Sequence, residues 1–347
     1  MAERPLAVLG ATGYTGGLVV ERAREAGLPL RLVGRRRDAL EALARAGEEV
    51  RVADARDSSS VATAVDGAFA VASLAGPFLE VGFGPVEAAL SANVHYLDTS
   101  AEQAFAREIY ERFDSRAREQ ELVLLTSFGF DYVPGDLAAR LAADGLEPVD
   151  EIDVAYGVRG VAVSGGTLRT MSSLMRQGHV CRADGRLVES RFGATTRRFR
   201  FPRRERSALE WGGTEPLTVP RHTAVRTVRS YVCAPRAVAP IAPIARVGAP
   251  FLRLAARAWR GSSHRARERS TFGVVAEARG SGGARRVTLN GGDFYGLTAL
   301  LIVRAAEALR GGEVRKAGAL APAEAFEPRA LIERLDPLLR LHSAVDL

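Results

Sequence analysis

The chain has 347 residues, of which 47% are hydrophobic and 26% charged, so it is long enough for two domains and can bury a core. Its two cysteines, Cys181 and Cys233, are too few for a disulfide scaffold, and we expect a reducing, cytoplasmic location without a secretory signal. The formal net charge is +7, but no nucleic-acid-binding motif accompanies it, so we do not expect nucleic acid as a partner.

Strands and helices alternate through the first third of the chain. Strands are predicted at Pro5–Leu9, Leu30–Val33, Glu49–Val52, Ala68–Ser73, Val94–Leu97 and Leu122–Thr126. Helices are predicted at Gly13–Ala26, Asp38–Ala46, Val61–Asp66, Pro85–Ala92 and Glu102–Gln120. This spacing is typical of an α/β fold with a parallel sheet and helices on both faces. Ligands of such sheets bind at the carboxyl ends of the strands.

The first predicted strand ends in a glycine-rich turn that opens the first helix. Glycines permit a tight turn and the close approach of a pyrophosphate to backbone N–H groups, and the helix N-terminus adds partial positive charge. The spacing is G-x-x-G-x-x-G, and the alternative is a plain glycine-rich turn. We predict that the cofactor phosphates bind at Gly10, Thr12, Gly13, Tyr14, Thr15 and Gly16.

The second predicted strand ends in Gly34 followed by Arg35, Arg36 and Arg37. An NAD-preferring site usually has a carboxylate here for the ribose 2′-hydroxyl, whereas arginine suits a 2′-phosphate. We therefore predict NADP(H) as the cofactor, held by Arg35 and Arg36; the alternative is a solvated basic helix start. Asp54, after the third strand, is a candidate acceptor for the adenine amino group.

Several oxidoreductase classes are excluded by missing residues. Short-chain dehydrogenases need a tyrosine with lysine four residues later, and the only lysine, Lys316, does not stand at that spacing. Reductases with a catalytic cysteine need that residue near the end of the Rossmann half, where none occurs before Cys181. The five histidines are scattered, so we expect no metal site.

Three segments fall at the ends of successive predicted strands: Leu74–Phe78 with Gly82, His95–Ser100 and Phe128–Asp136. Together with the first loop they resemble the saccharopine dehydrogenase-like oxidoreductases, which include the trans-acting enoyl reductases. That family shows a G-P-[YF] turn, an H-Y-x-D segment and a G-F-D-x-x-P-x-D segment. Further similar runs are Ser164–Thr167, Tyr295–Thr298 and Gly318–Pro322.

The resemblance implies a Rossmann-type NADP-binding domain over residues 1–135 and an inserted α+β domain over residues 136–292. It also implies C-terminal helices over residues 293–347 that return to the first domain. In the second domain, Asp150–Tyr156 and Val287–Asn290 are predicted strands and Thr167–Gln177 a predicted helix, which suits a mixed sheet. Such a sheet often mediates association, so we expect a homodimer.

The resemblance also suggests site residues. It places Gly76 and Pro77 against the ribose and nicotinamide, Tyr96 and Asp98 facing the hydride, and residues 129–131 around the nicotinamide. The predicted cofactor residues here are Ala75, Gly76, Pro77, Ser100, Gly129 and Phe130. The candidate catalytic residues are Tyr96, Asp98, Asp131 and Tyr132, because hydride addition requires a proton at the other atom of the double bond.

These assignments have structural alternatives. Asp98 precedes Thr99, Ser100 and Glu102, so its segment can serve only to cap a helix. Asp131 can be a turn residue before Pro134, and a structural role is preferred for His95.

The middle of the chain bears on the substrate. The arginine-rich stretch 182–206 suits an acidic carrier protein or the phosphates of phosphopantetheine or coenzyme A, or is a solvated surface. Ala237–Trp259 is apolar but too broken by prolines and arginines to cross a bilayer. We consider this segment as a lid over an apolar substrate or as a peripheral membrane contact, with a core helix as the alternative.

The sequence thus predicts an NADPH-dependent reductase acting on a small-molecule or carrier-bound acyl substrate, with hydride transfer to an activated C=C bond. Two alternatives stay open: reduction of a C=N bond in an amino-acid-like substrate, and a non-catalytic regulator that senses NADP.

Overall fold

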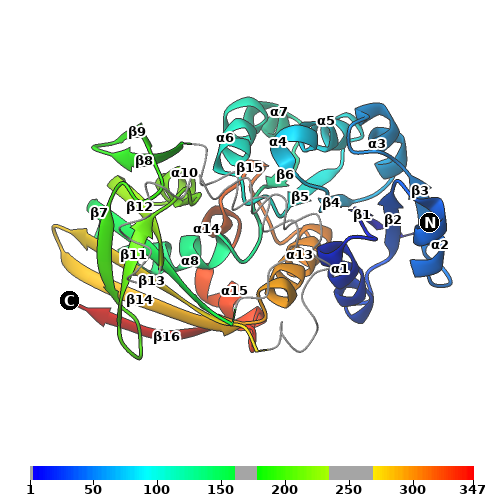
Figure 1. Cartoon of the computed structure of the whole chain (residues 1–347). Helices are drawn as coiled ribbons and strands as arrows, with labels where there is room; N and C mark the ends of the chain where they lie inside the picture. Colours follow the sequence, from blue (N-terminus) through cyan, green and yellow to red (C-terminus); the bar gives the residue numbers. More distant parts are fainter. Residues whose placement is uncertain (1–2, 161–177, 234–268) are drawn as a thin grey trace. The chain divides into compact units, whose positions relative to one another are not determined.

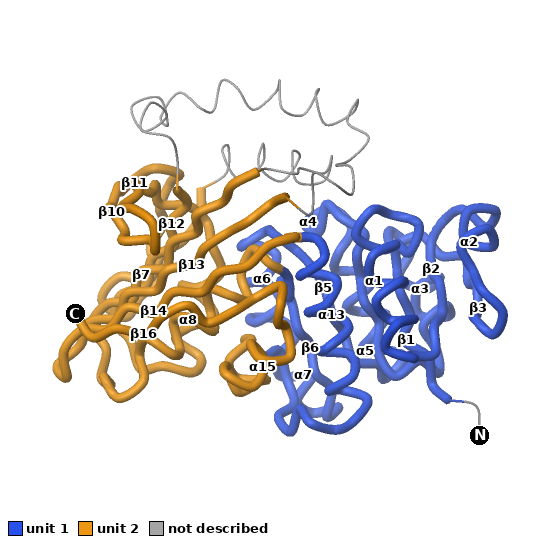
Figure 2. The backbone as a smooth tube through the Cα atoms, turned by 90° about the horizontal axis from the view of Figure 1, so that it is seen from below, with its two compact units in different colours: residues 1–129, 295–320 blue, residues 130–294, 321–347 orange. Residues whose placement is uncertain are grey.

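The computed structural model describes residues 3–160, 178–233 and 269–347. The chain divides into two compact units, each with its own β-sheet (Figure 2). Unit 1 comprises Met1–Gly129 and Tyr295–Leu320, and unit 2 comprises Phe130–Phe294 and Ala321–Leu347.

Some predicted segments lie outside the described residues. They are the helix Thr167–Gln177, the motif Ser164–Thr167 and the apolar segment Ala237–Trp259.

Unit 1 contains a seven-stranded sheet, sheet A, in which every strand pair is parallel. In spatial order its strands are β15 (Gly318–Ala319), β6 (Val123–Leu125), β5 (His95–Asp98), β4 (Ala70–Ser73), β1 (Leu6–Leu9), β2 (Leu30–Gly34) and β3 (Glu49–Val52). The central strands β1 and β4 are entirely buried, which explains their small apolar sequences. The order β3-β2-β1-β4-β5-β6 is that of dinucleotide-binding folds, where the winding reverses between β1 and β4.

Helices cover both faces of sheet A. They are α1 (Tyr14–Glu25), α2 (Arg37–Leu43), α3 (Ser58–Val65), α4 (Phe78–Val81), α5 (Phe83–Ser91), α6 (Gln103–Arg112), α7 (Asp114–Glu119) and α13 (Phe294–Arg310). Figure 1 shows α1 and α13 on one side of the sheet and α3, α5, α6 and α7 on the other. Apolar residues of these last four helices form one buried core cluster with residues of β1, β2, β4, β5 and β6. The predicted α/β fold class is therefore confirmed for this unit.

The long helix predicted over Glu102–Gln120 is two helices in the structure. α6 and α7 meet at Phe113, which is the C-cap of one and the N-cap of the other. The Phe113 ring is buried and stacks on Phe83 with centroids 6.5 Å apart. Burial of this ring fixes the break, which a periodic helical pattern does not reveal.

Unit 2 contains a nine-stranded mixed sheet, sheet B. Its main path runs β10 (Thr196–Arg200), β11 (Glu205–Glu210), β12 (Val225–Cys233), β7 (Val149–Arg159), β13 (Thr271–Gly280), β14 (Gly283–Gly292) and β16 (Leu339–Asp346). Off this path, β8 (His179–Ala183) pairs with β12 and with β9 (Arg186–Ser190). Among the described strands of sheet B, only the β12–β7 pair is parallel. The predicted strands Asp150–Tyr156 and Val287–Asn290 lie within β7 and β14.

Among the residues that the structure describes, the helices of unit 2 are short apart from α8. They are α8 (Val133–Ala143), α10 (Glu215–Thr218), the 3-10 helix η1 (Val219–Arg221), α14 (Pro322–Ala325) and α15 (Pro328–Arg334). α8 packs on β7, β13 and β14, so it covers one face of sheet B. It begins directly after the predicted catalytic residues Asp131 and Tyr132.

The C-terminal part of the chain differs from the prediction. Only residues 295–320 of the segment 293–347 belong to unit 1, and Ala321–Leu347 belongs to unit 2. The described chain also ends in the strand β16 rather than a helix, and β16 pairs antiparallel with β14. β16 thereby provides hydrogen-bond partners for the backbone of β14 along the edge that faces away from β13. This pairing joins distant segments, so local sequence patterns do not predict it. The first boundary lies at Gly129 rather than at residue 135.

Within the described part of the chain, no helix combines the length and apolar character needed to cross a membrane.

Candidate cofactor and catalytic residues

The turn between β1 and α1 has the geometry of a phosphate-binding loop. Gly10 has φ +88°, in the left-handed region that glycine adopts without strain, and the Gly13 N–H donates to the Gly10 carbonyl at 2.9 Å. Gly13 is the N-cap of α1 and supplies no side-chain cap, so the helix N-terminus is left open. Thr12 and Gly13 are exposed, which makes the positive end of α1 accessible to an anion.

At two glycines of this loop, neighbouring backbone atoms leave little room for a side chain. A Cβ on Gly16 would overlap the carbonyl oxygen of Gly10. A Cβ on Gly10 would lie 3.3 Å from the Leu74 carbonyl carbon and 3.4 Å from the Ala75 nitrogen. The structure thereby brings the glycine loop together with Ala75, another predicted cofactor residue, at the carboxyl edge of sheet A. This cradle fits a dinucleotide pyrophosphate.

Tyr14 and Thr15 lie half-buried in the first turn of α1. The Tyr14 ring packs edge-on against Tyr295 of α13, with centroids 4.9 Å apart and an interplanar angle of 88°. Tyr295 opens the Tyr295–Thr298 motif singled out in the sequence. That C-terminal motif therefore supports the cofactor loop within unit 1.

Arg35 and Arg36 are exposed at the carboxyl end of β2, and Arg36 is the N-cap of α2. Among the described residues, neither guanidinium has an ion-pair or hydrogen-bond partner. The next arginine, Arg37, instead reaches Glu41 at 3.4 Å on the same helix. Two unpaired guanidinium groups and no carboxylate at this strand end fit the recognition of a 2′-phosphate.

Asp54 is half-exposed after β3. Its Oδ1 accepts a hydrogen bond from the Arg56 backbone N–H at 3.1 Å, and its own backbone N–H donates to Ser60 Oγ at 3.2 Å. These bonds fix the turn between β3 and α3, and contact between Asp54 and an adenine amino group stays a prediction.

Gly76 is exposed and Pro77 half-buried after β4, directly before α4. The Glu102 carboxylate binds the N-terminus of α4, accepting from the Phe78 N–H at 2.7 Å and the Leu79 N–H at 3.1 Å. Glu102 is 8% exposed. Glu102 therefore anchors the turn that carries Gly76 and Pro77, and its side chain does not cap its own helix α6.

Tyr96 and Asp98 have no exposed surface. Tyr96 belongs to the core cluster of unit 1. Asp98 Oδ1 accepts hydrogen bonds from the Ser100 N–H and the Ser127 N–H, each at 2.8 Å. Both N–H groups belong to loops and not to α6, which begins at Gln103, so the Asp98 carboxylate joins the loops after β5 and β6 instead of capping that helix. Its catalytic role stays a prediction.

The surroundings of these two side chains shift both pKa values. Burial raises the pKa of Asp98 to about 6, although the two backbone N–H groups oppose the shift. Burial and the neighbouring Asp98 carboxyl raise the pKa of Tyr96. Among the described residues, the Tyr96 hydroxyl and Asp98 Oδ2 have no hydrogen-bond partner at a suitable distance and angle. Tyr96 therefore stays protonated at neutral pH.

The remaining predicted cofactor residues are divided between the two units: Ser100 and Gly129 belong to unit 1 and Phe130 to unit 2. Ser100 is buried after β5, where its Oγ accepts from the Glu102 N–H at 3.1 Å. Gly129 ends the first segment of unit 1, and a Cβ there would lie 3.4 Å from Thr298 Cγ2. Phe130 belongs to unit 2, where its ring stacks on Phe294 with centroids 4.8 Å apart. The structure thus gives Phe130 a role in the core of unit 2, and its contact with the cofactor stays a prediction.

Asp131 combines partial exposure with a raised pKa. It is partly exposed, and no described residue donates a hydrogen bond to its carboxylate. Burial raises the pKa of this carboxyl to about 6. A carboxyl of this kind holds a proton closer to neutral pH than an ordinary aspartate does, which general acid catalysis requires.

Tyr132 is 2% exposed, and its ring stacks on Trp211 at 5.9 Å with an interplanar angle of 25°. This packing supports the turn beside Asp131. The prediction that Tyr132 itself donates a proton has no support from its burial.

Sequence reasoning missed the groups that surround this turn in unit 2. The Tyr156 hydroxyl donates to the buried Glu215 carboxylate at 2.6 Å, and burial raises the pKa of Glu215 to about 7. Asp136 accepts from the Ala323 N–H at 2.8 Å and lies 3.1 Å from His222 Nε2. Tyr156 and Glu215 are 59 residues apart in the chain, so no local signal joins them.

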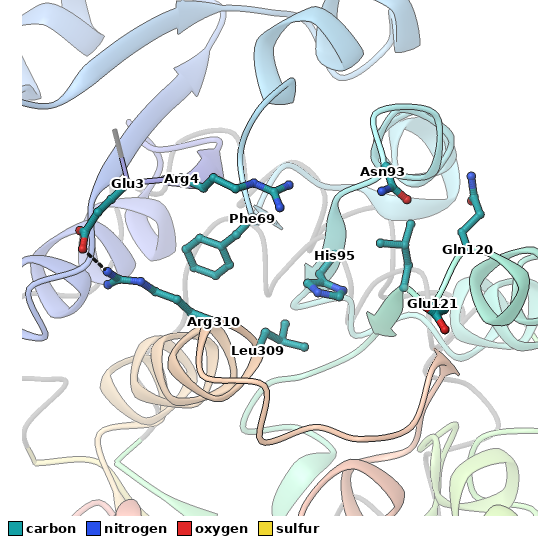
Figure 3. A pocket seen from close by; sticks show the side chains of 10 residues that line it. Glu3, Arg4, Phe69, Asn93, His95, Gln120, Glu121, Leu309 and Arg310 are labelled. Carbon is teal, nitrogen blue, oxygen red and sulfur yellow. Dashed lines mark ion pairs between the residues drawn. The ribbon is translucent and has the colours of Figure 1, made fainter. Parts of the chain in front are cut away.

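A cavity of about 500 Å³ lies at the opposite, amino edge of sheet A (Figure 3). Its lining includes Arg4, Phe69 and His95, which stand before or at the starts of β1, β4 and β5. His95 Nδ1 accepts from the Val123 N–H at 3.1 Å, and burial lowers the pKa of its ring. His95 therefore has the structural role preferred from the sequence, and this cavity is separate from the glycine loop.

The arginine-rich stretch is partly an internal network. Arg197 pairs with Asp153 and reaches Glu277 at 3.1 Å on sheet B. Other arginines on β9, β10 and the following turn are exposed: Arg186, Arg191, Arg198, Arg200, Arg203 and Arg204. An acidic partner for this surface stays a prediction.

Comparisons with known proteins agree with this geometry. Residues 10–143 match a family model described as NAD(P)H-binding. A trans-acting enoyl reductase of Mycobacterium tuberculosis is 27% identical over 212 residues, covering 56% of this chain and 50% of the relative. A saccharopine dehydrogenase-like oxidoreductase of Bos taurus is 27% identical over 195 residues, covering 48% and 46%. The chain therefore spans about half the length of the curated relatives that it matches.

The fold is shared with a solved structure, apo saccharopine dehydrogenase (L-Glu forming) from Saccharomyces cerevisiae. The TM-score is 0.67 over 99% of this chain and 100% of that chain, at 12% identity. The predicted resemblance is thus confirmed. The chain contains an NAD(P)H-binding domain, has the saccharopine dehydrogenase fold and is related to the saccharopine dehydrogenase-like oxidoreductases and trans-acting enoyl reductases.

Replacing Gly16 tests the phosphate loop. Gly16→Ala places a methyl group against the Gly10 carbonyl, so the loop must shift, and we expect NADPH binding to weaken by at least about tenfold. Gly17→Ala is the matched control, because nothing lies within 4 Å of a Cβ there. Titration of protein fluorescence with NADPH measures both, and equal affinities for the two variants would contradict the loop assignment.

Asp98→Asn tests the internal role of Asp98. The folded-state pKa of about 6 lies above the ordinary value of 3.8, so ionisation destabilises the fold and wild type loses stability as pH rises between these values. Urea unfolding should show Asp98→Asn gaining about 1–3 kcal/mol relative to wild type between about pH 4 and about pH 8.

Asp57→Asn is the control for this titration. Hydrogen bonds from Ser59 and Ser60 lower the pKa of Asp57, so the stability that ionised Asp57 contributes is lost as pH falls. The pH dependence of unfolding due to Asp57 therefore has the opposite sign to that due to Asp98. A pH-independent difference for Asp98→Asn would show that Asp98 does not titrate near 6.

Proposed function

We propose that this chain, a relative of the saccharopine dehydrogenase-like oxidoreductases, is an NADPH-dependent reductase that reduces an activated C=C bond of an acyl substrate. The observation that carries the proposal is the open glycine loop at α1 beside a strand end with two unpaired arginines, Arg35 and Arg36. The relatives named trans-acting enoyl reductases favour a conjugated C=C bond as the target.

NADPH, when bound, supplies a hydride for the β-carbon of the enoyl group. The protein must then protonate the α-carbon, so that one hydride and one proton saturate the bond. We assign that proton to Asp131, because its carboxyl is partly exposed, accepts no hydrogen bond from a described residue and has a pKa raised to about 6. Tyr96 and Asp98 are assigned to support of the cofactor edge instead, because they are fully buried.

The acyl group is proposed to arrive as a thioester, either free or on a carrier. The exposed arginines on β9, β10 and the following turn form a basic surface that suits the acidic surface of a carrier protein or a coenzyme A phosphate. We further propose that the protein acts as a homodimer in the cytoplasm.

The test of this function is NADPH oxidation by the purified chain with a crotonyl thioester of N-acetylcysteamine. The saturated butyryl thioester is the control, since it offers no C=C bond. Turnover with the crotonyl probe alone supports the proposal. Turnover only with an aldehyde together with L-glutamate, which form a C=N bond, would favour imine reduction instead. NADPH binding without turnover of either probe would favour the sensor alternative.

Cofactor choice should depend on the two unpaired arginines. Arg35→Ala and Arg36→Ala each remove a guanidinium placed for the 2′-phosphate, so we expect NADPH affinity to fall about tenfold while NADH affinity stays within about twofold. Arg37→Ala is the control, because Arg37 reaches Glu41. Equal losses for NADPH and NADH would contradict 2′-phosphate recognition at these residues.

The pH profile should report Asp131. A proton donor must be protonated, so kcat/KM for the crotonyl probe should be constant below about pH 6 and fall above it. Asp131→Asn should lower kcat by about 100-fold or more and remove this limb, whereas the exposed Asp144→Asn should keep the wild-type profile. An unchanged profile in Asp131→Asn would assign the proton to another group.

A further inference from the structure

The first turn of α8 lacks a cap from its own segment. Tyr132 is the N-cap residue but makes no side-chain cap bond, and Pro134 has no N–H. The Gly135 N–H, otherwise an orphan of this helix start, donates to the Tyr156 hydroxyl at 3.1 Å. The cap for α8 therefore comes from β7, a different element of unit 2.

A buried carboxylate fixes the Tyr156 hydroxyl in this position. Tyr156 Oη lies 2.6 Å from Glu215 Oε1 and 3.3 Å from the Tyr132 carbonyl oxygen. Glu215 Oε2 accepts a second hydrogen bond from Ser230 Oγ at 2.5 Å, and Glu215 has no exposed surface. Because the hydroxyl donates its proton to Glu215 Oε1, its direction is set by that bond and a lone pair of the same oxygen is left for the Gly135 N–H.

The space around Gly135 shows how closely this pair approaches the turn. A Cβ on Gly135 would overlap both the Tyr156 hydroxyl and Glu215 Oε1. The Trp211 ring contacts both tyrosine rings, with its centroid 6.0 Å from that of Tyr156 and 5.9 Å from that of Tyr132. The start of α8 thus fits closely against this pair.

Asp131 stands in the same turn, one residue before the N-cap Tyr132. Burial and the Glu215 carboxylate raise the pKa of Tyr156, and the charge of Asp131 adds to this shift to a smaller degree. On the other side of the turn Asp136 is held by the Ala323 N–H and His222. Among the residues that the structure describes, none donates a hydrogen bond to the Asp131 carboxylate, so the backbone of the turn sets its position.

We propose that Glu215 and Tyr156 are a positioning pair that fixes the turn Phe130–Asp136 and thereby aims the carboxyl of Asp131. The pair does not touch the reacting atoms and acts through the backbone at Tyr132 and Gly135. This role rests on the proposed function in so far as Asp131 is the proton donor, whereas the hydrogen-bonded cap itself does not depend on it.

The experiment compares hydrogen–deuterium exchange of the peptide covering residues 130–136 in four variants of the full chain. Tyr156→Phe removes the hydroxyl, and Glu215→Ala removes its acceptor. Ser230→Ala is the matched control, because it also removes one buried hydrogen bond to Glu215 but leaves the bond to Tyr156. Glu215→Gln is the conservative variant, since its amide oxygen still accepts from Tyr156 and its NH₂ group can donate to Ser230.

We expect exchange in this peptide to be about five- to tenfold faster in Tyr156→Phe and Glu215→Ala, and within about twofold of wild type in Ser230→Ala and Glu215→Gln. Equal exchange in Tyr156→Phe and Ser230→Ala, whether fast or slow, would overturn the proposal. If Glu215→Ala does not fold, the comparison of Tyr156→Phe with Ser230→Ala still decides it.

Kinetics with the crotonyl thioester then connect the cap to the reaction. Tyr156→Phe should lower kcat about tenfold and leave KM for NADPH unchanged, and Ser230→Ala should retain wild-type kcat. An unchanged kcat in Tyr156→Phe would overturn the link to Asp131. Absence of turnover in the wild type would refute the proposed function instead, and the exchange measurement would still decide the positioning pair.

Discussion

The close contact between Gly16 and the Gly10 carbonyl is the constraint on which the cofactor edge depends. It brings the start of α1 against the end of β1 with no side chain between them. The N-terminus of α1 is therefore open to an anion, and Ala75 at the end of β4 lies against the same loop. The direction of winding in sheet A reverses between β1 and β4, which is where dinucleotides bind in this fold.

Buried carboxylates hold the loops around this edge and the turn in unit 2. Glu102 binds the N-terminus of α4, Asp98 joins the loops after β5 and β6, and Glu215 orients Tyr156 at the start of α8. Each accepts two hydrogen bonds, which offsets the cost of burial. Asp131 differs because no described residue donates to it. This contrast separates carboxyl groups that organise the backbone from the one proposed to move a proton.

The sequence predicted what local patterns determine. Alternating strands and helices gave sheet A, and the spacing of Gly10, Gly13 and Gly16 gave the loop. It did not distinguish a strand-end residue that faces a ligand from one that faces the core, so Tyr96 and Asp98 were predicted to face the hydride. The C-terminal strand β16, the Glu102 bond to α4 and the Tyr156–Glu215 pair depend on contacts between distant segments. Those contacts are fixed by packing and leave no periodic or short-motif signal.

Transfer of a deuteride from NADPH labelled at C4 of the nicotinamide is the most direct test of whether this protein reduces an activated C=C bond with hydride from NADPH. The crotonyl thioester would be reduced in ordinary water and the product examined by NMR. An enoyl reductase should place one deuterium at the β-carbon and a solvent proton at the α-carbon, with label transferred from only one face of the nicotinamide. Deuterium absent from the product, or a product reduced at the carbonyl carbon, would contradict an enoyl reductase.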